Sequence, residues 1–277
     1  MNMLLVYFTQ SGNTKRVAEA MAEEFIARGD TVRHVPMQEA LPADMAACDV
    51  LGFGTPCFES QAPAPVKDFL RRLPHLNGKP AFVFATCGGS PGRVLFDLTR
   101  IMRERGASVM AGFKTRGEVH HPAPCLTGRM PGRPDRSDLA KARLFAASIH
   151  DHMLSGRTGA ISGSSKGAFS PRWRFYELVS LIAQPFILRI LLPRPEADRS
   201  TCSQCNICVE ECPVGSISMT PYPAPDRRCI RCYRCQNTCP EKAISSSWLF
   251  GNIVIFALYN TVFARLFGDV EPGERIY

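Results

Sequence analysis

The strongest constraint on the fold of this chain is a cysteine motif that occurs twice. The segments "CSQCNICVEECP" and "CIRCYRCQNTCP" share the pattern C-x2-C-x2-C-x3-C-P and begin at Cys202 and Cys229, 27 residues apart. Eight of the 12 cysteines of the chain lie in these two runs. Such spacing is typical of metal ligands, and the third cysteine with the C-P ending favours iron–sulfur ligation. A pair of zinc sites, the rival interpretation, accounts for the C-x2-C spacing alone.

Iron–sulfur ligation of this kind divides each run, because the first three cysteines fit one cube and the fourth reaches the other. We therefore predict two [4Fe–4S] clusters in the C-terminal part of the chain. The expected ligands of the first cluster are Cys202, Cys205, Cys208 and Cys239. The expected ligands of the second cluster are Cys229, Cys232, Cys235 and Cys212.

Residues 199–245 resemble a bacterial two-cluster ferredoxin, with all eight ligand positions filled. Ferredoxins of this type tend to be acidic, whereas this segment carries four arginines around its second cysteine run: Arg227, Arg228, Arg231 and Arg234. Because reduction adds negative charge, these arginines are expected to raise the potential of the second cluster relative to an acidic setting. They indicate an acidic docking partner, or else only a solvated face.

A second motif lies near the N-terminus, in "YFTQSGNTKRVAEAM" (residues 7–21), which follows an apolar run and opens a helical pattern. Hydroxyl and amide side chains around Gly12, between a strand and a helix, are typical of a phosphate site. The nucleoside-triphosphate pattern G-x4-G-K-[ST] fails, since Tyr7 occupies its first glycine and Asn13 its lysine. The loop therefore fits a single phosphate monoester.

The first 155 residues alternate short apolar runs with helical spacing, which predicts a doubly wound parallel α/β sheet. Strands are expected at 3–8, 31–35, 49–54, 80–86 and 107–113, and helices at 14–29, 64–73, 92–106 and 135–154. In the helix at 14–29, the spacing puts Val17, Ala18, Met21, Phe25 and Ile26 on one face. Ligands of such sheets bind beyond the carboxyl ends of the strands. The loops at 9–14, 54–63 and 86–93 follow such ends.

Residues 1–150 resemble flavodoxins, whose FMN phosphate loop has a hydroxyl residue, any residue, a hydroxyl residue, Gly, Asn and Thr. The resemblance implies that the loops at 54–63 and 86–93 form the two walls of the isoalloxazine site. Phe58 would stack on the ring, unless it only packs within its loop, and the second loop has no aromatic residue, which leaves one flavin edge open. The implied FMN contacts are Thr9, Gln10, Ser11, Gly12, Asn13, Thr14, Thr55, Pro56, Cys57, Phe58, Thr86, Cys87, Gly88, Gly89 and Gly92.

Four segments follow from these patterns: a flavodoxin-like FMN domain (1–155), a Gly/Ser linker with an apolar helix (156–198), a two-cluster ferredoxin domain (199–245) and an apolar helical tail (246–277). The apolar stretches at 172–192 and 248–267 are shorter or more interrupted than the roughly 20 apolar residues of a membrane span. Two interpretations stay open for them: packing within the protein, and attachment to a membrane surface.

The net charge of +8 is concentrated in residues 156–195, where six basic residues and one acidic residue give +5. This segment has no nucleic-acid motif, so the basic surface favours an acidic protein or an anionic membrane over nucleic acid. No secretory leader precedes the first strand, which predicts a cytoplasmic protein, with peripheral contact at the inner face of the membrane as an extension of that prediction. His120 and His121 are expected to be solvated loop residues.

The order of the segments resembles the flavodoxin–ferredoxin fusion proteins of anaerobic bacteria and archaea. This resemblance implies electron transfer between FMN, two [4Fe–4S] clusters and a partner redox protein. The chain has no dinucleotide fingerprint, hydrolytic triad or paired acid/base carboxylates, so no catalytic residues are expected and the donor is expected to be a protein. Two alternatives stay open: a membrane-surface reductase of a small or quinone-like acceptor, and a redox-sensing or scaffold protein.

Overall fold

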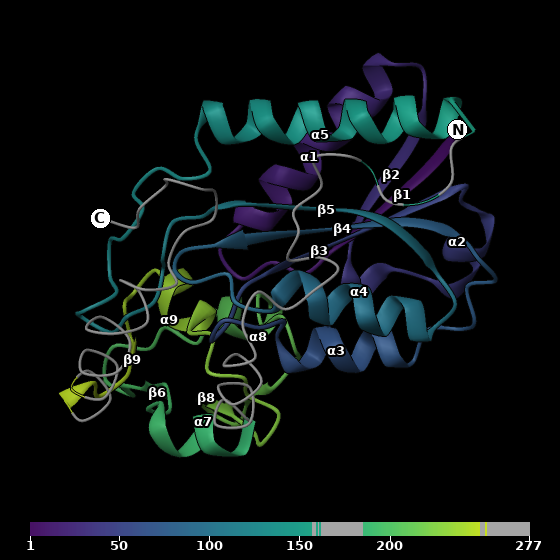
Figure 1. The fold of residues 1–277 in the computed structure, drawn as a ribbon. Coiled ribbons are helices and arrows are strands. Elements are labelled where there is room, and N and C mark those ends of the chain that lie inside the picture. The colour runs from purple at the N-terminus through teal and green to yellow at the C-terminus, as the bar shows by residue number, and fades with distance from the viewer. Residues whose placement is uncertain (157–158, 160, 162–184, 250–252, 254–277) are drawn as a thin grey trace. The chain divides into compact units, whose positions relative to one another are not determined.

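A computed structural model describes residues 1–156, 159, 161, 185–249 and 253 of the chain (Figure 1). Contacts between residues divide this part of the chain into two units. The first unit contains the described residues up to 118 and from 130 to 161, and the second contains residues 119–129 and the described residues from 185 onwards. The chain therefore leaves the first unit after Glu118, contributes a loop to the second, and returns at Met130.

The first unit is built on a five-stranded parallel sheet with the strand order β2-β1-β3-β4-β5. Its strands are β1 (Asn2–Tyr7), β2 (Thr31–Pro36), β3 (Val50–Pro56), β4 (Pro80–Cys87) and β5 (Ser108–Arg116). Because β1 lies between β2 and β3, the direction of winding reverses there. This order defines a flavodoxin-like doubly wound fold, as predicted, and its ligand position lies beyond the carboxyl ends of the strands at the reversal.

Helices cover both faces of this sheet (Figure 1). One face carries α1 (Asn13–Ala27) and α5 (Arg136–Leu154), which pack on each other, and the other carries α3 (Ala64–Arg71) and α4 (Val94–Glu104). Apolar spacing predicts all four. It does not predict the 3-10 helix η1 (Met37–Glu39) or α2 (Pro42–Ala47), because three and six residues are too few for a helical period to be recognised.

Helix α1 buries a narrower stripe than its sequence predicts. Val17, Ala18, Met21 and Phe25 are fully buried against the sheet, but Ile26 is 57% exposed. Each residue turns the helix by about 100°, so Ile26 lies beyond the edge of a stripe that Phe25 already closes.

The second unit contains one short fold twice, shifted by 27 residues. Its strands form two antiparallel pairs, β6 (Glu196–Ala197) with β9 (Ile244–Ser245) and β7 (Ile217–Met219) with β8 (Pro223–Pro225). The helix α8 (Ile207–Glu210) likewise returns as α9 (Arg234–Thr238). The first strand of each copy therefore pairs with the second strand of the other copy, so the two copies form one interlocked structure.

The backbone conformation repeats with the same shift. Positive φ angles occur in three pairs of positions: Gln204 and Arg231, Asn206 and Tyr233, and Gly215 and Lys242. Five of these six residues are not glycine, and the left-handed region costs such residues roughly 1–2 kcal/mol each. The buried residues that pack between the copies are paired in the same way: Cys208 with Cys235, and Ile217 with Ile244.

Residues 119–129 belong to the apolar core of this second unit. Ala123 packs there with Leu192, Tyr233 and Trp248. The imidazole of His121 lies edge-on to two aromatic rings, with ring centroids 5.1 Å from Tyr233 and 4.7 Å from Trp248. Burial lowers the pKa of His121 to about 4, so the ring is neutral at pH 7. His120 is exposed as expected, whereas His121 is not a solvated loop residue.

No helix within the described residues is long and apolar enough to cross a membrane. Most of the apolar stretches at 172–192 and 248–267 falls outside the part that the structure describes. Within the first stretch, the described residues Pro185–Leu191 form α7. Within the second stretch, Trp248 is buried and Leu249 is exposed.

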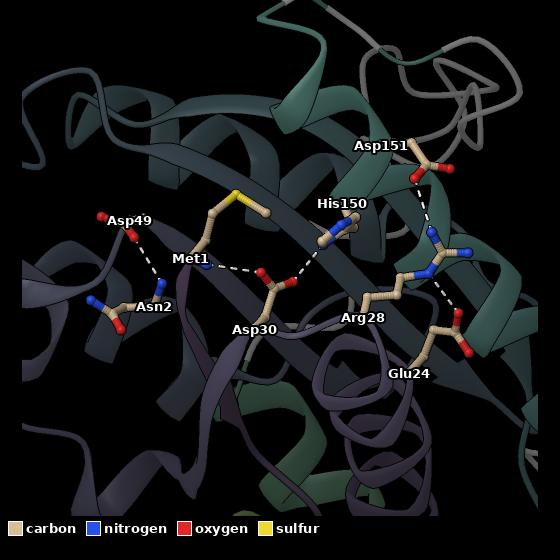
Figure 2. A network of polar contacts seen from close by, with 8 residues as sticks. All are labelled: Met1, Asn2, Glu24, Arg28, Asp30, Asp49, His150 and Asp151. Carbon is tan, nitrogen blue, oxygen red and sulfur yellow. Dashed lines mark hydrogen bonds and ion pairs between the residues drawn. The ribbon is translucent and has the colours of Figure 1, made fainter.

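A polar network closes the first unit at the amino ends of its strands, opposite the ligand edge (Figure 2). The buried carboxylate of Asp30 accepts hydrogen bonds from the amino group of Met1 at 2.9 Å and from His150 Nδ1 at 2.7 Å. These contacts join the start of β1, the end of α1 and α5. Nearby, the exposed Asp151 pairs with Arg28 at 2.9 Å. The buried Asp30–His150 pair is thus the part of the network that links separate elements through the core.

We predict that Asp30→Asn lowers the free energy of unfolding by about 1–3 kcal/mol, because it weakens a buried charged hydrogen bond. Asp151→Asn is the matched control, since its ion pair is exposed and contributes about 0–1 kcal/mol. Burial alone would raise the pKa of Asp30, but the Met1 amino group and His150 outweigh it and lower that pKa below 3.8. The Asp30 contribution is therefore complete above pH 4 and lost as the pH falls through the folded-state pKa.

Urea unfolding of the three proteins at pH 7 and at pH 3 measures these differences. Equal stability of Asp30→Asn and Asp151→Asn at pH 7 would contradict the prediction.

Candidate functional site

The predicted phosphate loop connects β1 to α1 at the ligand edge of the sheet. Gly12 stands just before the helix with φ of 91°, a left-handed conformation that glycine adopts without strain. Its N–H donates to Thr9 Oγ1 at 3.0 Å, which folds the loop back on itself. No side chain caps α1, and its first turn has no acidic residue. The free N–H groups and the helix dipole therefore favour an anion at this position.

Two side chains tie this loop to the neighbouring strands. The hydroxyls of Thr14 and Thr86 lie 2.9 Å apart, and both residues are buried. Asn13 Nδ2 donates to the carbonyl of Glu118, just after β5, at 2.9 Å. Residues expected to contact FMN in two different loops are thus brought together at the ends of β1 and β4. Thr9 Oγ1 accepts from Gly12, which leaves its O–H to donate to a ligand, and the Thr14 O–H can do the same when Thr86 is the donor of their shared hydrogen bond.

The two predicted walls of the flavin site contact each other directly. Phe58 and Gln61 exchange backbone hydrogen bonds of 3.0 and 2.9 Å across a tight turn, in which Glu59 and Ser60 have φ of 46° and 62°. Ser60 O accepts a hydrogen bond of 2.8 Å from the N–H of Arg93 in the second loop. A Cβ on Gly92 would lie 2.1 Å from that same carbonyl. Gly92, which we expected to contact the flavin, is therefore required for the close packing of the two loops, because a side chain at this position would collide with Ser60.

Other expected contacts lie at the same edge. Thr55 is buried near the end of β3, followed by the half-buried Pro56 and Phe58. The side chain of Phe58 is thus in position to form one wall, while stacking on a flavin stays a prediction. Residues of the phosphate loop (Thr9, Gln10, Ser11) are partly exposed, as are Gly88 and Gly89 in the second loop.

A buried arginine at this edge was not predicted. Arg116 ends β5, is 1% exposed, and donates from Nη1 to the carbonyl of Gly89 at 3.0 Å. Its backbone partner on β4 is Cys87. A guanidinium is rarely buried without a role, and this one places a positive charge beside the second wall. The only sequence signal was a charged residue at the carboxyl end of β5, and Lys114 two residues before it is charged as well.

The eight motif cysteines lie in two groups, each drawn from both runs. Burial, and then the charges of Cys205, Cys202 and Cys239, raise the pKa of Cys208. Burial, and then the charges of Cys232, Cys229 and Cys212, raise the pKa of Cys235 to about 12. Each of these two cysteines thus lies near the three that the motif assigns to the same cube, while the ligation of two clusters stays a prediction. Among the described residues, no three or more His, Cys, Asp or Glu side chains are arranged around a single metal ion.

Backbone N–H groups point at the fourth cysteine of each run. The N–H of Ser216 donates to Cys212 Sγ at 3.3 Å, and the N–H of Ala243 donates to Cys239 Sγ at 3.3 Å. Such bonds to ligand sulfurs favour the more negative state of a cluster. Burial raises the pKa of Cys232 and of Cys235 to about 12, so iron would displace the protons of these thiols on binding.

The basic patch around the second run is partly neutralised. Arg228 pairs with Asp226 at 2.8 Å, and Arg234 pairs with Glu211. Arg227 remains exposed. The net positive charge that an acidic partner would meet is thus smaller than the sequence count indicates.

Comparison with known proteins identifies both parts of the chain. Residues 8–118 match the family described as NADPH-dependent FMN reductase, and residues 195–218 match the 4Fe-4S binding domain. No curated protein matches the chain. The chain thus joins a flavodoxin-like FMN domain to a 4Fe–4S domain. The architecture is therefore a fusion of a flavodoxin-like part and a ferredoxin-like part.

Several solved structures are similar to the first unit. A flavodoxin from the domain Archaea is 21% identical over 56% of this chain and 99% of its own, with a TM-score of 0.47. Oxidised flavodoxin 1 from Bacillus cereus is 20% identical over 55% of this chain and 99% of its own, with a TM-score of 0.43. The rubredoxin oxygen:oxidoreductase from the anaerobe Desulfovibrio gigas is 16% identical over 56% of this chain but 36% of its own, with a TM-score of 0.46.

We predict that Thr14→Val weakens FMN binding roughly 10-fold to 100-fold, the effect of losing one hydrogen bond to a charged group. Iron content should not change, because the cysteine groups lie in the other unit. Thr99→Val is the matched control: Thr99 is also buried, but it lies within α4, away from the loop. Fluorescence titration of the flavin-free proteins with FMN gives the affinities. Equal affinity in wild type and Thr14→Val would place the phosphate elsewhere.

Proposed function

We propose that this protein passes electrons between FMN and two [4Fe–4S] clusters, and to or from a partner redox protein. The observation that carries the proposal is the 27-residue repeat of the second unit. Two equivalent copies, each contributing three cysteines to one group and the fourth to the other, are what two clusters require. A single cluster would need only one of the two cysteine groups.

FMN, when bound, exchanges one or two electrons, and each cluster exchanges one. The residues of the chain would hold these groups. The loop and first turn of α1, from Gly12 to Thr14, would hold the FMN phosphate, while the turn at 58–61 and the loop at 86–93 would form the walls of the ring site. Arg116 provides positive charge at the second wall, which favours added electron density on a nearby ligand. The N–H groups of Ser216 and Ala243 do the same for the clusters.

The physiological donor is proposed to be a protein. The matched family description names NADPH, but the chain has no G-x-G-x-x-G fingerprint after a strand. Docking is proposed on the second unit, where Arg227 is exposed and, unlike Arg228 and Arg234, forms no ion pair with the described residues. An acidic surface would complement this charge.

We predict that four single substitutions test the cluster assignment. If the fourth cysteines cross over, Cys202→Ser and Cys239→Ser affect the same cluster, and Cys229→Ser and Cys212→Ser affect the other. Wild-type protein prepared anaerobically should contain about eight iron and eight sulfide per chain, with one FMN. Cys125→Ser, outside both motifs, is the control. Electron paramagnetic resonance of the reduced proteins identifies the cluster that remains in each.

The assignment follows from which variants give the same spectrum. If Cys239→Ser leaves the same cluster as Cys229→Ser, each run holds its own cluster and the crossed assignment is wrong. Zinc in place of iron in the wild-type protein would overturn the whole proposal.

A second function has support from exposed apolar residues of the second unit. Ile190, Leu249 and Ile253 are 68%, 81% and 61% exposed. They belong to the two apolar stretches, and Arg189 next to Ile190 is also exposed. Apolar side chains beside basic ones are typical of proteins that bind a membrane surface. On this alternative, the protein reduces a small or quinone-like acceptor there.

Flotation with liposomes separates the two functions. The membrane alternative predicts that the protein floats with vesicles containing anionic lipid, and that Leu249→Ser with Ile253→Ser reduces the floating fraction. Leu144→Ser is the control, because Leu144 is 72% exposed in the first unit. Equal recovery of all three proteins at the bottom of the gradient would remove this alternative and leave the protein partner.

A further inference from the structure

Two cysteines outside the iron–sulfur motifs meet at the ligand edge of the sheet. Cys57 follows β3, and Cys87 ends β4. The last paired residues of these strands are Pro56 and Thr86, and the N–H of Cys57 donates to Thr86 O at 2.9 Å. The parallel ladder thus continues by one residue and places Cys57 directly opposite Cys87. Residues opposite each other in a sheet direct their side chains to the same face.

The spacing of the pair suits a disulfide. Neighbouring strands lie about 4.8 Å apart, and disulfides join residues with Cα atoms about 4.4–6.8 Å apart. The two thiols already share a side-chain hydrogen bond. The sulfur of Cys57 also lies 3.4 and 3.5 Å from the carbonyls of Ser90 and Pro91, so the second wall holds its position. No large movement of the backbone is needed to form the bond.

The two sulfurs differ in how accessible they are to molecules in solution. Cys87 is fully buried, whereas Cys57 is half-buried and can be reached by a small molecule. The hydrogen bond with Cys87, followed by burial, raises the pKa of the Cys57 thiol well above its ordinary value. The nucleophile is the thiolate, so Cys57 attacks as its proton is released to solvent.

We infer that Cys57 and Cys87 are a redox-active dithiol that a hydroperoxide oxidises to a disulfide across the ends of β3 and β4. First, the Cys57 sulfur attacks one peroxide oxygen; the O–O bond breaks, and a sulfenic acid and one molecule of alcohol or water form. Second, the Cys87 sulfur attacks the Cys57 sulfur and water leaves. In sum, two thiols and one hydroperoxide give one disulfide, one alcohol and one water, and the sulfurs lose two electrons that reduce the peroxide.

The disulfide would act on the first unit alone. It would fix the start of the turn at 58–61 to the end of β4, next to Thr86, which holds Thr14 of the phosphate loop. The inference needs neither FMN nor clusters to be bound, so it stands or fails separately from the proposed function.

Peptide mapping of the full-length protein tests the inference. The protein is treated with hydrogen peroxide or left untreated, unfolded in excess iodoacetamide, and digested with trypsin. We expect treated protein to contain a linked pair of the peptides 34–67 and 73–93, lighter by two hydrogens than the two free peptides and separated by dithiothreitol. Because residues 34–67 also contain Cys48, two variants assign the link: it should persist in Cys48→Ser and disappear in Cys57→Ser.

Cys48 is a matched control, since it is also a buried free thiol of the same peptide, but it donates to Met45 O rather than to another thiol. Alkylated Cys57 and Cys87 in the treated protein would overturn the inference. A link that persists in Cys57→Ser, or that joins Cys87 to the motif cysteines instead, would overturn it equally.

Discussion

The exchange between the two copies of the 27-residue repeat is the constraint on which the second unit depends. Each cysteine group takes three sulfurs from one copy and one from the other, and each strand pair is completed in the same way. The left-handed positions at Asn206 and Tyr233 start α8 and α9 and turn the cysteine runs. Such strained positions persist only where the surrounding contacts hold them. The two copies therefore supply each other with the contacts that make their own conformations possible.

The ligand edge of the first unit is formed in a different way. Its ligand edge is assembled by contacts between loops: Thr14 with Thr86, Ser60 with Arg93 and Gly92, and Arg116 with Gly89. These contacts are made between residues of the first unit itself, and they tie its loops to one another. Ordering a loop is part of the free-energy cost of binding, and contacts of this kind lower that cost.

Periodic patterns predicted the regular elements well, and single contacts escaped them. The five strands and four long helices followed from apolar spacing, and the cysteine groups from the motif. The prediction that Ile26 is buried was wrong, because the buried stripe of α1 is already complete at Phe25. Arg116 and the Ser60–Gly92 contact could not be predicted, because they depend on which loops meet in space. For the same reason, nothing in the pattern around His121 indicated that residues 119–129 belong to the second unit and pack there with Tyr233 and Trp248.

The excursion of residues 119–129 has a consequence for how the two halves of this protein can change. A ferredoxin half cut out after the linker would lack Ala123 and His121, and its cluster of Leu192, Tyr233 and Trp248 would be exposed to water. The flavodoxin-like half, cut out in turn, would carry a loop whose apolar side chains have lost their cover. Neither half can therefore be separated from the other without loss of apolar contacts. A substitution in the coding region of one must be tolerated by the core of the other, which ties their evolution together more closely than a simple end-to-end fusion would.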